Sequence, residues 1–302
     1  MEKLAKINDV SIKESAQKYS VRAKVNIFCK TIWKENVSGK TAIFIHGGGS
    51  GGDHSLCVRP AKHMIQAGLY SKVLTPDRRG AGQSSLLEKK PTFKDNAEDM
   101  KALLDSMGIH EKVTAIGISY GGPVALTLAA IDSRVDEVVL LASSPSLDPK
   151  GITKLTYKLG FLEPMIKSFY KKNLGKLEPK NIDFDASYDV ESQKELTTLF
   201  TESIKHTPAE KLDSLIYENA ATLDLENGSI DRSIQLDIPI YQIIGDRDTT
   251  WEINMVENYK DRFPNCKVKI LPGFNHKDVF TKAHDYYAEV ITFLQQYAKV
   301  SV

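Results

Sequence analysis

The chain has 302 residues, of which 41% are hydrophobic and 26% are charged, a globular composition that excludes intrinsic disorder as a global description. Its 40 Lys and Arg residues nearly balance 39 Asp and Glu residues, and the resulting net charge of +1 argues against nucleic acid as the main ligand. The length exceeds the usual size of one domain, so we expect two domains or one large α/β domain that carries an insertion.

The sequence predicts a cytoplasmic protein that does not bind membranes. The first ten residues carry charges but are not followed by the apolar segment of a secretory signal. No apolar run approaches the roughly 18 residues that a membrane span needs. The cysteines are odd in number and far apart, which favours neither disulfides nor a CxxC metal site. We therefore expect buried or half-buried thiols at Cys29, Cys57 and Cys266.

The first predicted element is a long strand. Over residues 21–33, apolar residues alternate with mostly polar ones, which is typical of a strand buried on one face. Residues 7–12 are a candidate antiparallel partner. After Lys40 the apolar residues form short continuous runs, which predict strands buried on both faces of a parallel sheet. These runs are residues 42–45, 73–74, 113–118, 138–141 and 240–244.

Helical patterns separate these runs. The clearest places Ala97, Met100, Leu103, Leu104 and Met107 on one apolar stripe. A last alternating strand, residues 266–271, precedes an amphipathic helix that carries Tyr287, Val290, Ile291, Leu294 and Ala298. The alternation of strands and helices predicts an α/β fold with a mostly parallel, doubly wound sheet and helices on both of its faces.

One long segment interrupts this alternation. Residues 146–233 contain no strand-like run of the core type and are rich in Lys and Glu. A crossover between parallel strands needs only about a dozen residues or one helix. We therefore expect a helical cap inserted at 146–233, with residues 1–145 and 234–302 forming the core domain. Side chains that could line a pocket, or equally form the core of the cap itself, are Tyr157, Phe161, Met165, Phe169 and Tyr170.

The main chemical motif is the sequence GISYGG at residues 117–122, between a predicted strand and a helix-like segment. A sharp turn from strand to helix brings the backbones on either side of Ser119 together, and glycine avoids a clash there. The turn exposes the hydroxyl at the carboxyl end of the strand, where the amides of the helix N-terminus face any charge that develops. The motif predicts that Ser119 is a nucleophile; the alternative is a structural serine.

A second motif, HGGG at residues 46–49, closes the first run that follows Lys40. Its unhindered backbone N–H groups could bind an oxyanion, and a tetrahedral intermediate needs two such donors aimed at one oxygen. The best candidates are the amides of Gly48 and Tyr120. The alternative is a glycine-rich turn without a function. We expect His46 to brace the loop.

Together these motifs resemble the α/β-hydrolase superfamily, from about residue 41 to the C-terminus apart from the predicted cap. The sequence DRRGAGQSS at residues 77–85 looks like the DxRGxGxS turn that follows the second core strand of many members. We interpret it as architecture, because Gly80 and Gly82 permit positive φ. The resemblance implies an α/β-hydrolase fold with a helical cap, and a catalytic triad in the chain order serine, acid, histidine.

The resemblance also implies positions for the base and the acid. His276 follows the last predicted strand, where the family carries its histidine; the other six histidines lie before or near the motif, in the predicted cap or on the final helix. Asp248, in the sequence GDRD after residues 240–244, matches the family position of the acid. Asp246 is a near alternative, and Asp148 occupies an acid position known in some branches of the family.

The implied reaction needs neither a cofactor nor a metal ion. Ser119 attacks an acyl carbon, His276 accepts its proton and Asp248 fixes the histidine tautomer. The spacing of histidines and carboxylates contains no metal-ligand motif such as HExxH. The expected partner is a small-molecule substrate, and the sequence does not determine the oligomeric state.

Several functions fit these residues. The first is a carboxylesterase-like serine hydrolase that cleaves a small carboxylic ester through an acyl-enzyme. The second is a proline-iminopeptidase-like aminopeptidase, although that family usually reads HGGPG and carries Met or Trp where Tyr120 stands. Its free-amine substrate needs acidic groups, for which the predicted cap offers Glu163, Glu178, Glu191, Glu195 and Glu202. The others are a perhydrolase, a carbon–carbon bond hydrolase or an acyltransferase with the same triad, or a catalytically silent ligand receptor.

Overall fold

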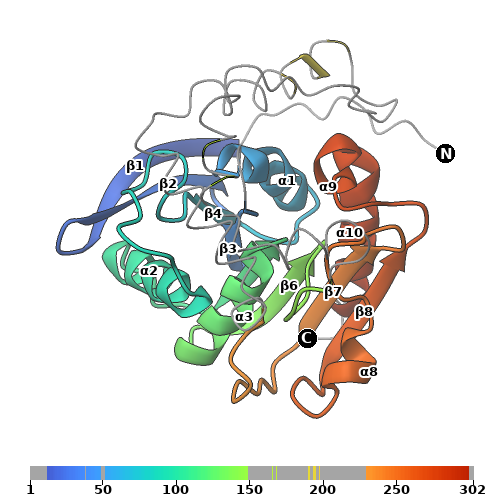
Figure 1. Ribbon diagram of the computed structural model, residues 1–302. Coiled ribbons are helices and arrows are strands. Elements are labelled where there is room, and N and C mark those ends of the chain that lie inside the picture. The colour runs from blue at the N-terminus through green and yellow to red at the C-terminus, as the bar shows by residue number, and fades with distance from the viewer. Residues whose placement is uncertain are drawn as a thin grey trace.

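The computed structural model describes residues 12–37, 39–48, 52–148 and 229–298, with a few single positions between 165 and 197. Its centre is one eight-stranded sheet with the order β1-β2-β4-β3-β5-β6-β7-β8 (Figure 1). The strands are β1 (Ile12–Arg22), β2 (Val25–Lys34), β3 (Thr41–Ile45), β4 (Lys72–Pro76), β5 (Val113–Ile118), β6 (Val135–Leu141), β7 (Ile240–Gly245) and β8 (Cys266–Leu271). The β1-β2 and β2-β4 pairs are antiparallel, and all other neighbours are parallel.

Helices cover both faces of the sheet (Figure 1). The described helices are α1 (Ser55–Gln66), α2 (Phe93–Ser106), α3 (Gly121–Ile131), α8 (Met255–Tyr259), α9 (Asp278–Thr281) and α10 (Ala283–Ala298). The predicted α/β fold with a mostly parallel, doubly wound sheet is therefore confirmed.

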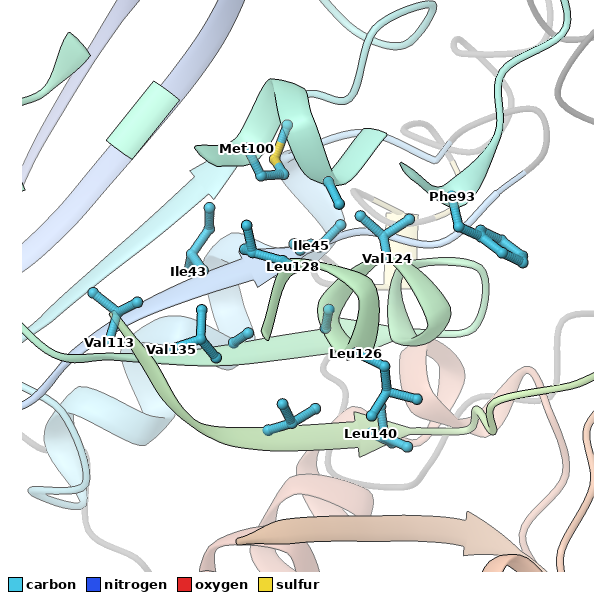
Figure 2. Close-up of a cluster of buried hydrophobic side chains, with 14 of the residues drawn as sticks. Ile43, Ile45, Phe93, Met100, Val113, Val124, Leu126, Leu128, Val135 and Leu140 are labelled. Carbon is cyan, nitrogen blue, oxygen red and sulfur yellow. The ribbon is translucent and has the colours of Figure 1, made fainter. Parts of the chain in front are cut away.

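Two hydrophobic clusters hold these layers together. Because successive residues of a strand point to opposite faces, Ile43 of β3 packs with α2 and α3, whereas Phe44 packs with α1 and α10. Figure 2 shows the first cluster, in which Met100 of α2 and Val124 of α3 lie over the strands. The continuous apolar runs of the sequence thus correspond to strands that are buried on both faces.

The N-terminal strand prediction was wrong in its bounds. Residues 21–33 are not one strand, because the chain turns between β1 and β2, and Lys24 adopts a φ of 63° there. The antiparallel partner of β2 is β1, with Lys13 opposite Trp33 and Ser20 opposite Asn26. Residues 7–11 of the candidate partner segment lie outside the described residues.

The predicted cap, residues 146–233, lies outside the described residues apart from its two ends and a few single positions. The same holds for the glutamates considered as amine ligands and for the candidate pocket residues, except Met165, which is 67% exposed. Among the helices that the structure describes, none is both long and apolar enough for a bilayer crossing. The three cysteines are free and buried, as predicted, and burial raises the pKa of the Cys29 thiol to about 12.

Candidate active site

The predicted site residues come from three strand ends that meet at one edge of the sheet. Ser119 follows β5, Asp248 follows β7 and His276 follows β8. Because the strands from β5 to β8 are parallel, their carboxyl ends share an edge. Open α/β sheets bind their ligands at this edge.

The turn after β5 places the backbone of Ser119 in the left-handed region, with a φ of 50°. Such a conformation of a non-glycine residue costs of order 1–3 kcal/mol. A Cβ at Gly117 would lie 2.2 Å from the carbonyl oxygen of Gly121, and a Cβ at Gly121 would lie 2.3 Å from the carbonyl oxygen of Ile45. Only glycine fits at these two positions, because the obstacles are backbone atoms. The sharp turn predicted from GISYGG is present.

A continuous series of hydrogen bonds joins Ser119, His276 and Asp248. Ser119 Oγ lies 3.0 Å from His276 Nε2, and His276 Nδ1 lies 2.7 Å from Asp248 Oδ2. The His276 side chain is 28% exposed, whereas the Asp248 side chain is completely buried. Because the carboxylate accepts a hydrogen bond from the Nδ1–H group, the proton of the neutral imidazole stays on Nδ1 and Nε2 is left as the acceptor for the Ser119 hydroxyl.

The loops that carry Asp248 and His276 meet closely. The N–H of Arg247 donates to the carbonyl oxygen of Phe274 at 3.0 Å. A Cβ at Gly245 would lie 2.1 Å from that same oxygen, so a side chain there would separate the two loops. The glycine after β7 thus permits the contact between the carboxylate and the imidazole.

Among the three candidate acids, Asp248 is the one whose side chain contacts His276. Its second oxygen, Oδ1, accepts the N–H of Thr250 at 2.8 Å. Asp246 and Asp148 are exposed, and Asp246 Oδ1 accepts the N–H of Gly273 at 2.7 Å. The geometry therefore favours Asp248 as the residue that orients the imidazole.

The HGGG loop, of which residues 46–48 are described, lies against the turn that carries Ser119. A Cβ at Gly47 would lie 3.3 Å from Ser119 Cβ, and a Cβ at Gly48 would lie 3.2 Å from Tyr120 Cβ. The two predicted oxyanion donors, the amides of Gly48 and Tyr120, thus belong to segments in direct contact. Their role in binding an oxyanion stays a prediction.

Arg78 ties this loop to Tyr120. Its Nη2 donates to the carbonyl oxygen of Gly47 at 2.7 Å, and its Nε donates to that of His46 at 3.2 Å. The guanidinium carbon lies 4.5 Å from the centroid of the Tyr120 ring, and the side chain is buried. The DRRGAGQSS segment therefore has a structural role, in which Arg78 holds the two segments that carry the candidate oxyanion donors.

His46 is neutral and fixed in one tautomer. Its Nε2 accepts the N–H of Arg78 at 2.9 Å, and its Nδ1 lies 2.7 Å from the carbonyl oxygen of Gly47, so Nδ1 carries the proton. Burial, with a further contribution from the charge of Arg78, lowers the pKa of His46 to about 3. These bonds brace the loop, as predicted from the sequence.

Within the described ranges, one group of side chains has the spacing of metal ligands. The ligand atoms of Asp53, His54 and Asp77 lie within 4.8 Å of one another. The carboxylate of Asp77 accepts hydrogen bonds from the N–H and Nδ1 of His54 at 2.7 and 2.8 Å, and from the N–H of Gln83 at 2.7 Å. Burial is the largest single effect and alone would raise the pKa of Asp77, but the hydrogen bonds and charges around its carboxylate, those of His54 first, together outweigh it and the pKa is lowered. These contacts join the loop before α1 to the turn after β4.

Sequence reasoning missed two side chains of the candidate site. One is Arg78, whose signal was a charged residue two positions after a buried strand. The other is Trp251, whose indole Nε1 lies 3.3 Å from Ser119 Oγ. Its signal was a large aromatic residue three positions after Asp248, in a loop at the ligand-binding edge.

Comparisons with known proteins agree with the fold. Residues 41–283 match the sequence model of the family described as "alpha/beta hydrolase fold". A relative from Mycoplasma pneumoniae, named "Putative proline iminopeptidase", is 31% identical over 109 residues, which span 35% of this chain and 33% of the relative.

Solved structures with similar folds include enzymes with different named activities. An esterase from Thermogutta terrifontis has a TM-score of 0.65 at 15% identity, over 93% of this chain and 98% of the other. A 2-hydroxy-6-oxo-6-phenylhexa-2,4-dienoate hydrolase from Rhodococcus sp. strain RHA1 has a TM-score of 0.68 at 17% identity, over 94% of this chain and 100% of the other. At these identities the likeness concerns the fold.

Proposed function

The chain belongs to the α/β hydrolase fold family, and on that basis we propose that it is a serine hydrolase that cleaves a small carboxylic ester. The observation that carries the proposal is the hydrogen-bonded series from Ser119 through His276 to Asp248. A serine hydroxyl is a poor nucleophile at neutral pH, and this series gives it a proton acceptor in the correct tautomer.

The reaction proceeds in two halves. In acylation, Ser119 Oγ forms a bond to the acyl carbon while its proton passes to His276 Nε2. The bond to the leaving alcohol then breaks, and His276 returns the proton to that alcohol. In deacylation, water attacks the acyl carbon as His276 takes its proton, and the C–Oγ bond breaks as the proton moves to Ser119.

Two further roles belong to the proposal. The amides of Gly48 and Tyr120 bind the oxyanion of each tetrahedral intermediate, a role supported by the contact between their segments. The buried carboxylate of Asp248 holds the imidazole and stabilises its protonated form. The residues present complete the acid–base chemistry of both halves.

The substrate class rests on chemistry and likeness together. An ester needs only the triad, the oxyanion donors and room for an acyl group, whereas an amine-directed peptidase needs acidic ligands as well. The Thermogutta terrifontis structure of similar fold is named an esterase, which supports the proposal of an ester substrate.

The test is the hydrolysis of short-chain p-nitrophenyl esters by the purified protein. We expect turnover that Ser119→Ala reduces to the buffer rate, together with labelling of Ser119 by an organophosphate. Ser106→Ala at the end of α2, an exposed serine outside the site, should keep the wild-type rate. Wild-type-like turnover by Ser119→Ala would refute Ser119 as the nucleophile.

The likeness to the Mycoplasma pneumoniae relative favours a second candidate, an aminopeptidase that removes an N-terminal residue such as proline. The same assay should therefore include prolyl and alanyl nitroanilides. Anilide cleavage without ester preference would support this candidate. Absence of turnover on both substrate types would favour the other uses of the fold considered from the sequence, such as carbon–carbon bond cleavage or ligand reception.

A further inference from the structure

Ser119 Oγ has a second side-chain partner besides His276. The indole Nε1 of Trp251 donates to it at 3.3 Å. Trp251 is 1% exposed and is among the largest fully buried side chains of the described residues. A buried N–H without an acceptor is costly, so this contact with the reacting oxygen is also what satisfies the indole.

A buried amide bonds the backbone of the residue that follows Trp251. Gln242, fully buried in β7, donates through Nε2 to the carbonyl oxygens of Ser143 and Glu252, both at 2.9 Å. An isolated bridge also pairs Leu147 with Trp251. The segment after β6 and the loop after Asp248 are thereby joined, which holds the backbone that carries the indole.

We propose that Trp251 is a catalytic residue that stabilises negative charge on Ser119 Oγ; this inference rests on the proposed serine hydrolase function. In acylation, charge grows on Oγ as its proton passes to His276 and the bond to the acyl carbon forms. In deacylation, charge grows on Oγ again as the C–Oγ bond breaks and before His276 returns the proton. Trp251 keeps its own proton throughout and donates only a hydrogen bond.

The length of the contact fits this role. A distance of 3.3 Å is beyond the usual 2.9–3.0 Å of an N–H···O bond, so the neutral hydroxyl is held weakly. A charged oxygen attracts the donor more strongly and the bond shortens. In the acyl-enzyme, Oγ is an ester oxygen, which is a weaker acceptor than the hydroxyl oxygen or the charged oxygen. The contact is therefore stronger in the two transition states than in the states they connect, which is the condition for accelerating a reaction.

The kinetic test is Trp251→Phe, which removes the N–H and keeps an aromatic ring. Hydrogen bonds to charged groups contribute about 1.5–3 kcal/mol, so kcat on p-nitrophenyl acetate should fall by about tenfold to a hundredfold with little change in KM. The burst rate of acylation and the steady-state rate of deacylation should both fall. Trp33→Phe, which alters the other tryptophan of the chain, on β2, is the matched control and should leave both rates unchanged.

A raised KM with unchanged kcat would assign Trp251 to packing and overturn the inference. Different rate comparisons test the two proposals. The rates of wild type and Ser119→Ala test the proposed function, and the rates of wild type and Trp251→Phe test the role of Trp251. If wild type shows no burst and no turnover that depends on Ser119, both are overturned.

A second measurement does not depend on the folding of Trp251→Phe. The chain has two tryptophans, so the ¹⁵N-labelled protein gives two indole N–H resonances, which Trp33→Phe assigns. Ser119→Ala removes the acceptor and should move the Trp251 resonance upfield, as expected for a lost hydrogen bond. An unmoved resonance would show that the indole does not donate to Ser119 and would overturn the proposal.

Discussion

Replacing Asp248 by asparagine tests the tautomer on which the proposed mechanism depends. In the structure, Oδ2 of Asp248 accepts from His276 Nδ1 at 2.7 Å and Oδ1 accepts from the N–H of Thr250 at 2.8 Å. An asparagine has one acceptor and one donor in their place. The fixed backbone N–H of Thr250 requires the acceptor, so the amide NH₂ faces Nδ1. The imidazole must then carry its proton on Nε2, where it cannot accept the proton of Ser119.

The opposite orientation of the asparagine is unfavourable for a reason visible in the structure. It would place the NH₂ group against the N–H of Thr250, so that two donors face each other at the buried side chain of residue 248. A donor left without an acceptor there costs about 1–3 kcal/mol. This cost corresponds to a preference of about fivefold to 150-fold for the inactive tautomer. The loss of the carboxylate charge that stabilises the protonated imidazole lowers the rate further. Together these effects should lower kcat on p-nitrophenyl acetate by up to about 10⁴, with the melting temperature close to that of wild type.

The controls are the two exposed aspartates that the sequence left as alternative acids. Asp246→Asn keeps an oxygen that can accept from Gly273, and Asp148→Asn alters a residue at the surface. Both variants should retain wild-type rates. A loss of less than tenfold in Asp248→Asn, together with a severe loss in Asp148→Asn, would show that the acid lies in the segment after β6 and would refute this reasoning.

Three further predictions concern the support of the site. Gly117→Ala should destabilise the protein by several kcal/mol or prevent folding, because its Cβ would lie 2.2 Å from the backbone oxygen of Gly121; urea unfolding measures this. Burial holds the pKa of His46 at about 3 in the folded protein, whereas the pKa of an unfolded histidine is about 6.5. The unfolded state alone therefore binds a proton between these values, and the unfolding equilibrium should shift by up to about tenfold per pH unit as the pH falls through this window. His46→Gln should lack this component of the acid dependence in urea titrations at several pH values. Arg78→Lys loses the donors to the carbonyls of His46 and Gly47 and should lower kcat by up to about 10² by loosening the loop, while a rate equal to wild type would show that the loop holds without them.

The central strands could be predicted because burial on both faces leaves a direct mark on the sequence. The predicted range 113–118 coincides with β5, in which every residue is buried. The edge strand β8 also coincides with its predicted range, 266–271, but the signal there was alternation and not an apolar run. The run at residues 73–74 was too short to give the bounds of β4 (Lys72–Pro76), since Lys72, Thr75 and Pro76 are not part of an apolar run. Apolar continuity thus finds where a buried strand lies better than where it ends.

Two elements escaped prediction for local reasons. The turn between β1 and β2 uses Lys24 at a φ of 63°, where hairpins normally show Asn or Gly, so the alternation of residues 21–33 continued across it unnoticed. Helix α1 contains Pro60 in its interior, and an internal proline argues against a helix. Its buried residues Cys57, Ala61 and Met64 nevertheless recur at helical spacing, and their burial against the sheet compensates for the lost backbone hydrogen bond.

The candidate site divides in the same way. Ser119, Asp248 and His276 each follow a strand within a short motif, so their types and order along the chain could be read locally. Arg78 and Trp251 act through partners far away in the sequence, at His46 and Ser119. Such contacts depend on which strands become neighbours, and no local pattern encodes them.

The strained backbone of Ser119 persists because its hydrogen bonds leave it no alternative. Its N–H donates to the carbonyl oxygen of Leu141 at 3.0 Å, and its carbonyl oxygen accepts the N–H of Gly122 at 3.0 Å and the hydroxyl of Ser143 at 2.5 Å. Relaxing the φ of 50° would break these three bonds, and together they contribute about 1.5–4.5 kcal/mol against a strain of about 1–3 kcal/mol. Since the backbone is fixed from both sides, the side chain alone is free to exchange partners. Leu141 at the end of β6 and Ser143 just after it contribute none of the proposed reacting groups, yet they hold the backbone from which the nucleophile projects.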